Sequence, residues 1–287
     1  NDQAPLLAAI GVLSGGLFNV FGDYIFVFAF DMGIFGAGLA TAIGSVISCA
    51  VMLSHFFTKR NTLTFVNPER LLHKLKEISV VGFSTFFVDI AMGIMTILFN
   101  RQIIKYLGVN ALSVYGVIVT LSTFVQCCAY SVGQASQPII SVNFGAAQGH
   151  RIKETLKYAL YTVIFLGVFW TLLMQLFPNT FIKIFMTPAG GILKIAPDIM
   201  RCYGLSFLLL PFNIFSTYYF QALLKPRASF IVSVARGLFI SGGFIMILPF
   251  INADYLWFTM PLTESIVAVF AIAAMMHFNK NLSVKGR

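Results

Sequence analysis

The sequence predicts an all-α polytopic membrane protein, and three observations lead to this prediction. The 287 residues are 58% apolar and only 10% charged, whereas soluble domains hold roughly 25% charged residues. Several apolar stretches reach the roughly 20 residues that a helix needs to cross a bilayer. These stretches lack the alternation that is typical of outer-membrane barrels. The composition therefore argues against a soluble enzyme, a disordered chain, a nucleic-acid binder and a disulfide scaffold.

The apolar stretches define eight transmembrane helices. They cover residues 5–30, 34–57, 78–99, 110–137, 156–177, 195–223, 228–250 and 254–278. Each stretch is long and continuous, which favours helices because a helix satisfies its own backbone hydrogen bonds in lipid.

The net charge of +9 is explained by topology rather than by nucleic acid. If the first helix runs outward, the cytoplasmic segments hold thirteen basic residues, namely Lys59, Arg60, Arg70, Lys74, Lys76, Arg151, Lys153, Lys157, Lys225, Arg227, Lys280, Lys285 and Arg287. The outer segments hold four, namely Arg101, Lys105, Lys183 and Lys194. This bias follows the positive-inside rule. We therefore expect both ends of this chain to be cytoplasmic, in a bacterial cell membrane.

A polar stretch at residues 58–77 separates the first two helices from the other six. Residues 67–69 are typical of a helix N-terminus, and the apolar residues after them fall on one face, namely Leu71, Leu72, Leu75 and Ile78. This pattern predicts a cytoplasmic linker with a short interfacial amphipathic helix. The expected parts of the chain are a two-helix segment at 1–57, this linker at 58–77, a six-helix lobe at 78–279 and a cytoplasmic tail at 280–287.

An internal repeat relates the first helical hairpin to the last. Pro5 and Pro226 open the two hairpins, and His55 and His277 close them, at offsets of 221 and 222 residues. Such repeats are frequent in transporters. If both repeats have six helices, four helices precede this chain. We then expect it to be the C-terminal two-thirds of a twelve-helix protein with two six-helix lobes.

The first hairpin carries the clearest candidate site, because ionisable groups inside a membrane are usually functional. Asp23 lies four residues after Asn19, on the same helix face. Asp23 and Thr41 are each nine residues from the turn at Met32, which places both roughly 13 Å below the outer surface. Asn19, Asp23 and Thr41 could together bind a proton or Na⁺, and helix packing is the alternative role for Asp23. Small residues would let the two helices approach closely, namely Gly15, Gly16, Gly36, Ala37 and Gly38.

Two further polar groups lie within the expected helices. Asp89, near mid-depth, forms either a second proton or substrate-cation site or a hydrogen bond with Gln126 or Asn213. Arg236 and Glu264 lie on adjacent antiparallel helices, at heights that differ by about one helical turn. We expect these two to form a structural ion pair rather than a substrate site.

Several of these stretches resemble the multidrug and toxic compound extrusion (MATE) family. Residues 15–44, GGLFNVFGDYIFVFAFDMGIFGAGLATAIG, resemble the hairpin of its helices 5 and 6. Residues 1–5 resemble the loop before that hairpin, GQASQPIISVNFGA at 133–146 resembles the end of helix 8, and QALLKPRAS at 221–229 resembles the helix 10–11 loop. Glu264 fits the pattern of the last helix. The resemblance extends over nearly the whole chain.

This resemblance implies a twelve-helix, two-lobe transporter that exports organic, often cationic, compounds by Na⁺ or H⁺ antiport through alternating access. It places the N-lobe cation site on Asn19, Asp23 and Thr41. Some members hold a second acidic pair on helices 7 and 10, but here no acid lies in the middle of the helix at 195–223. We expect small amphiphilic or cationic substrates, no cofactor beyond the coupling ion, no nucleic-acid partner, and a monomer.

Other functions fit the sequence less well. A lipid-linked oligosaccharide flippase of the same superfamily would need a more cationic cavity, whereas only Arg236 lies deep. An enzyme is not expected, because the sequence lacks His-Glu-x-x-His, Gly-x-Ser-x-Gly and P-loop patterns. A channel would need a filter-like loop or a ring of acids.

Overall fold

The predicted all-α fold is confirmed by a computed structural model, which describes residues 5–57, 71–188 and 190–284. These residues are almost entirely helical, and none of the described residues lies in a strand. Seven of the described helical stretches are long and apolar enough to cross a membrane. They correspond to seven of the eight predicted spans. The eighth predicted span, 78–99, lies within helix α3 (Leu71–Tyr106).

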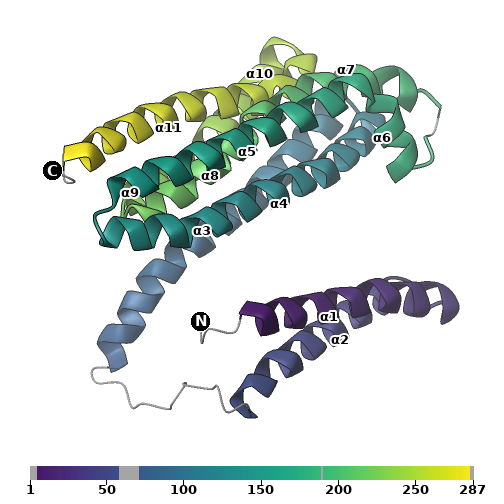
Figure 1. The fold of residues 1–287 in the computed structure, drawn as a ribbon. Coiled ribbons are helices and arrows are strands. Elements are labelled where there is room, and N and C mark those ends of the chain that lie inside the picture. The colour runs from purple at the N-terminus through teal and green to yellow at the C-terminus, as the bar shows by residue number, and fades with distance from the viewer. Residues whose placement is uncertain (1–4, 58–70, 189, 285–287) are drawn as a thin grey trace. The chain divides into compact units, whose positions relative to one another are not determined.

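The chain divides into two compact units, residues 1–74 and 75–287, and the first contains a helical hairpin (Figure 1). Its described elements are α1 (Pro5–Asp23), the π-helix η1 (Tyr24–Ala29), α2 (Gly33–Leu53) and the 3₁₀-helix η2 (Ser54–Phe57). The turn between the two arms uses left-handed backbone at Asp31 (φ 51°) and Gly33 (φ 54°). Glycine adopts this conformation without a steric penalty, so the predicted turn lies where the sequence placed it.

Close contact between backbones holds this hairpin together. A Cβ atom on Gly15 would overlap the Gly44 carbonyl oxygen and the Ser48 hydroxyl, and a Cβ on Gly36 would lie 2.9 Å from the Phe26 carbonyl carbon. The same atom on Gly16 or Gly38 would meet nothing within 4 Å. The prediction for these last two glycines was therefore wrong, because they lie away from the facing arm.

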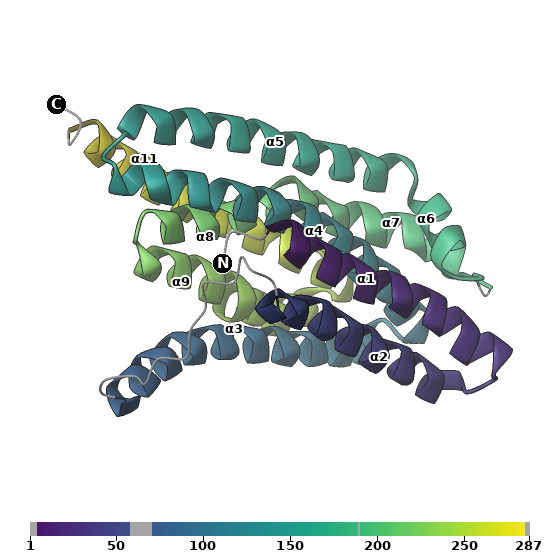
Figure 2. The same ribbon diagram turned by 60° about the horizontal axis from the view of Figure 1, so that its bottom comes forward.

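The second unit is a helical bundle. Its described elements are α3, α4 (Val109–Gly145), α5 (Gly149–Leu176), α6 (Pro178–Phe185), α7 (Ile192–Gly204), η3 (Leu205–Leu208), α8 (Leu210–Ala222), α9 (Pro226–Val234), the π-helix η4 (Ala235–Phe239), α10 (Ile240–Ile251), η5 (Ala253–Phe258) and α11 (Thr259–Val284). Helix α8 packs against α4, α5 and α11 (Figures 1 and 2).

Two details differ from the sequence prediction. The amphipathic linker helix is not a separate element: residues 71–77 form the first turns of α3, because no proline or glycine interrupts the chain at residue 78. The rest of the predicted linker, 58–70, lies outside the described residues. The span predicted at 195–223 forms one apolar stretch, Ile192–Ala222, with a 3₁₀ segment in its middle. Pro211 contributes to that irregularity because it cannot donate a backbone hydrogen bond.

Two apolar clusters fill the second unit along its length. The first packs the beginning of α4 against α7 and η5, with Phe99 and Tyr115 stacked at 4.7 Å between ring centroids and Trp257 beside them. The second packs the end of α4 against α5, α8, α9 and α11, around Phe215 and Tyr219. Each cluster is contributed by several helices, so the bundle is held at both ends.

The connections of the second unit lie at its two ends (Figures 1 and 2). The α4–α5 and α8–α9 connections and the end of α11 share one end, which carries Arg151, Lys153, Lys157, Lys225, Arg227 and Lys280. The connections around α6 and between α10 and α11 share the other. We call the first of these the basic end.

Candidate functional site

Two of the three residues predicted for the hairpin site are in direct contact. The Asn19 amide nitrogen donates a hydrogen bond of 3.0 Å to the Thr41 hydroxyl oxygen, which joins α1 to α2. The same hydroxyl donates to the Ala37 carbonyl oxygen at 3.0 Å. Thr41 thus contacts the residue one helical turn before Asp23, although the sequence placed Asp23 itself at the level of Thr41. The structure therefore holds the Asn19 amide and the Thr41 hydroxyl together between α1 and α2.

Asp23, the third predicted residue, does not join that hydrogen bond. It is the last residue of α1, at the point where the helix changes to the π-helix η1. Its side chain is half-buried, and its Oδ1 atom is buried without a hydrogen-bond partner among the described residues. Most buried carboxylate oxygens accept hydrogen bonds, and π-helical turns are frequent at functional sites. Asp23 thus presents a buried oxygen one helical turn beyond Asn19.

A second polar group lies inside the second unit, and we call it the Glu264 centre (Asn213, Arg236 and Glu264). The Arg236 Nε atom lies 2.6 Å from the Glu264 Oε1 atom. The Asn213 amide nitrogen donates to the other carboxylate oxygen at 2.6 Å and to the Glu264 backbone oxygen at 2.8 Å. Both carboxylate oxygens are therefore bonded, and the centre ties α8, η4 and α11 together.

The Glu264 centre lies at the junction of the two apolar clusters. On α8, Asn213 is followed by Ile214 of the first cluster and Phe215 of the second. On the last helical stretch, Glu264 lies between Trp257 of the first cluster and Val267 of the second. Glu264 and Asn213 have no exposed surface. A buried charge of this kind is tolerated because it is paired, so the arrangement suits a structural support.

The polar site predicted around Asp89, with Gln126 and Asn213, stays a prediction. Asn213 uses its amide nitrogen on Glu264 and makes no hydrogen bond with Gln126. Gln126 is half-buried on α4. The side chain of Asp89 lies outside the described residues. Helix rotation decides which of several neighbours Asn213 meets, and the sequence pattern does not specify that rotation.

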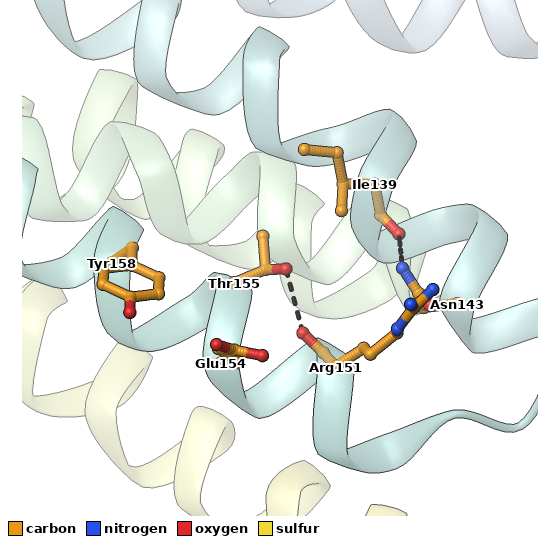
Figure 3. Close-up of a pocket in the computed structure, with 6 residues that line it drawn as sticks. All are labelled: Ile139, Asn143, Arg151, Glu154, Thr155 and Tyr158. Carbon is orange, nitrogen blue, oxygen red and sulfur yellow. Dashed lines mark hydrogen bonds between the residues drawn. The ribbon is translucent and has the colours of Figure 1, made fainter.

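One pocket with charged residues in its wall was not anticipated from the sequence. It lies between the end of α4 and the start of α5, and it is lined by Ile139, Asn143, Arg151, Glu154, Thr155 and Tyr158 (Figure 3). Two of these residues belong to the 133–146 motif, whose polar end was a signal that could have pointed to the pocket. No group of three His, Cys, Asp or Glu residues that could hold a metal ion is found in the described part of the chain.

Comparison with sequence families identifies relatives of this chain. The MatE family model matches residues 84–245. The multidrug export protein MepA of Staphylococcus saprophyticus is 27% identical over 241 residues, which are 83% of this chain and 52% of that protein. MepA of Staphylococcus aureus strain N315 is 26% identical over 287 residues, which are 98% of this chain and 62% of that protein. The chain thus spans between 52% and 62% of the length of these curated relatives.

Solved structures with the same fold are also found. One is described as the outward-facing conformation of a multidrug resistance MATE family transporter of the MOP superfamily. It matches with a TM-score of 0.83 at 20% identity and covers 96% of this chain and 62% of that one. A MOP superfamily transporter from Pyrococcus furiosus matches with a TM-score of 0.82 at 19% identity and the same coverage. At these identities the likeness shows a common fold.

Proposed function

The chain belongs to the MatE family of transporters, and on that premise we propose that it takes part in exporting small organic compounds in exchange for Na⁺ or H⁺. Proteins of this family are transporters rather than enzymes. The name of the relatives, multidrug export protein, supports amphiphilic or cationic compounds as the substrate class. The polar residues of the hairpin support coupling to an ion.

The observation that carries the proposal is the buried, unpartnered Oδ1 atom of Asp23. A carboxylate within a membrane-spanning segment is unfavourable unless it is paired or protonated. A proton on this oxygen would remove the charge, and Na⁺ would compensate it. Asn19 and Thr41, which already contact each other, would add neutral oxygen ligands of the kind that alkali cations accept. We infer that Asp23 holds the coupling ion.

The position of Asp23 also suggests how the ion would act on the helix. The residue lies where α1 gives way to η1, and the η1 backbone bonds Phe30 N–H to the Ile25 oxygen over five residues. A π-helical turn is less regular than an α-helix and is a place where a helix changes direction. A change of charge at this junction would favour one helix conformation over another, which is the requirement for a population shift.

We further infer that the basic end of the second unit faces the cytoplasm. The positive-inside rule assigns segments rich in Lys and Arg to that side. The structure supports this orientation in one respect: the basic segments at 151–157 and 225–227 lie at the same end (Figure 2). Labelling of a Lys153→Cys variant, from inside but not from outside intact cells, is the expected result.

The coupling role of Asp23 is tested by dye efflux from cells that carry the full-length protein. Asp23→Asn should lower efflux at normal expression by roughly ten- to a hundredfold. Asp31→Asn is the matched control, because Asp31 carries the same charge in the exposed turn of the same hairpin, and it should leave efflux intact. Unchanged efflux in the Asp23 variant would exclude the coupling role.

The coupling ion itself is identified in proteoliposomes. Uptake of dye into vesicles should respond to an imposed Na⁺ gradient or to an imposed pH gradient, and the response should be lost in Asp23→Asn. Uptake that follows the dye concentration alone, with neither gradient having an effect, would contradict antiport.

A further inference from the structure

The pocket between α4 and α5 lies at the basic end of the second unit and combines apolar surface with charged and polar groups (Figure 3). Its volume is ≈ 250 Å³. Figure 3 shows the Arg151 side chain directed toward Asn143 and the Glu154 side chain directed away from Asn143. The two charges therefore face different parts of the pocket. The pocket therefore offers a cation and a carboxylate at separate places.

The polar walls of the pocket are held in place by local hydrogen bonds. The Asn143 side chain is 8% exposed, and its amide nitrogen donates to the Ile139 carbonyl oxygen at 2.7 Å. The Thr155 hydroxyl donates to the Arg151 carbonyl oxygen at 2.9 Å. Because these side chains are already fixed on their own helices, a ligand would order little more than the Arg151 and Glu154 side chains.

The pocket lies where the headgroups of a bilayer are expected. It is formed by the last turns of α4 and the first turns of α5, both of which are long and apolar enough to cross a membrane. Tyr158 and Ile139 line it while remaining 63% and 50% exposed. Tyrosine is enriched at the membrane–water interface, and an exposed isoleucine beside it suits the start of an acyl chain. The cavity is thus positioned for a lipid rather than for a solute deep in the bundle.

The surrounding charge favours an anion. Lys153 and Lys157 are exposed on the same turns of α5, and Lys157 lies 5.8 Å from the centre of the Tyr161 ring. Together with Arg151, the two lysines give three positive charges near the pocket, against the one negative charge of Glu154. Basic pockets at the ends of transmembrane helices bind anionic lipid headgroups, and guanidinium groups suit phosphate oxygens.

We propose that this pocket binds the headgroup of an anionic phospholipid of the phosphoglycerol type. Its phosphate would accept hydrogen bonds from Arg151, and its terminal hydroxyls would donate to Glu154. A phosphocholine headgroup has no donor for the carboxylate. A phosphoethanolamine headgroup has one, but as a zwitterion it gains little from Lys153 and Lys157. The inference does not depend on the ion-coupling role of Asp23.

The proposal is tested by native mass spectrometry of the purified full-length protein with lipids of identical acyl chains. Phosphatidylglycerol should be retained in preference to phosphatidylcholine and phosphatidylethanolamine. Arg151→Gln should weaken its retention roughly tenfold, as the loss of a charge-assisted hydrogen bond would. Lys183→Gln is the control, because it removes the same charge from an exposed position on α6, at the other end of the unit. It should change retention far less.

A second variant tests the role of the carboxylate. Glu154→Ala should remove the preference for phosphatidylglycerol over phosphatidic acid, which has the phosphate but no terminal hydroxyls. Thermal melting of each variant should match the wild type, since Arg151 and Glu154 are exposed, so that weaker binding is not the result of unfolding.

Four results would overturn the proposal. Equal retention of phosphatidylglycerol and phosphatidylcholine would exclude a headgroup site. An equal loss in the Arg151 and Lys183 variants would show that net surface charge alone retains the lipid. A preference for phosphatidylethanolamine would exclude an anionic ligand. Displacement of the lipid by millimolar glycerol phosphate would show a site for a soluble phosphate.

Discussion

Two carboxylates within the predicted spans, Asp23 and Glu264, have opposite surroundings. Glu264 is fully buried, and its two oxygens are bonded to Arg236 and Asn213. Asp23 is half-buried, and its Oδ1 atom is buried without a partner among the described residues. The Glu264 carboxylate has little capacity for another ligand, whereas the Asp23 carboxylate retains an oxygen that can bind a ligand. The difference separates a residue that supports the fold from a residue suited to bind an ion.

The helices around the two carboxylates differ in the same way. The Glu264 centre joins α8, η4 and α11 at the junction of two apolar clusters, so any movement there would disturb both clusters. Asp23 lies on a two-helix hairpin at the change from α-helix to π-helix. Close packing resists continuous deformation, while an irregular helical turn can change with less disturbance. The hairpin is therefore the better place for a switch.

The largest effect is expected from breaking the Glu264 centre. Glu264→Gln would leave the mostly buried Arg236 guanidinium without its counter-charge, which costs up to about 3–5 kcal/mol. Melting of the purified protein in detergent should show a large loss of stability. The double variant Arg236→Gln with Glu264→Gln should recover much of it, because no unpaired charge remains. A wild-type melting temperature in Glu264→Gln would mean that the ion pair does not stabilise the bundle.

Asp23→Asn should give the reverse result. Its Oδ1 atom makes no hydrogen bond that the substitution would remove, so melting should change by less than about 1 kcal/mol. Efflux should fall roughly ten- to a hundredfold, which corresponds to the loss of one charge-assisted interaction. Melting and efflux should be measured on the same preparation. A loss of stability as large as that in Glu264→Gln would assign Asp23 a structural role and remove the contrast.

Gly15→Ala tests whether close backbone contact sets the shape of the hairpin. The added methyl would overlap the Gly44 oxygen and the Ser48 hydroxyl, and forcing such helices apart costs about 1–3 kcal/mol. Gly16→Ala is the matched control, since its methyl would meet nothing within 4 Å. The first variant should melt at a lower temperature than the second. Equal melting would show that the two helices can separate without loss.

The sequence predicted most of these elements, because apolar length and charge bias are properties of single helices. It also predicted that Asn19 and Thr41 would lie close enough to converge, since a short turn sets the relative height of two antiparallel helices. It did not predict that Asn213 would bond to Glu264. That contact depends on how α8 rotates among its neighbours, which packing of the whole bundle decides. The unpartnered oxygen of Asp23 and the pocket beside Arg151 likewise depend on side-chain directions.

The smallest expected effect concerns the hydrogen bond between Asn19 and Thr41. Such bonds between transmembrane helices contribute about 0.6 kcal/mol on average, so Thr41→Val should barely change melting. If the Thr41 hydroxyl is a ligand of the coupling ion, however, the same variant should weaken the dependence of uptake on Na⁺. Thr41→Ser keeps the hydroxyl and should restore that dependence. An equal loss in both variants would assign the effect to the missing methyl group or to helix packing, and the ion site would then consist of Asp23 without Thr41.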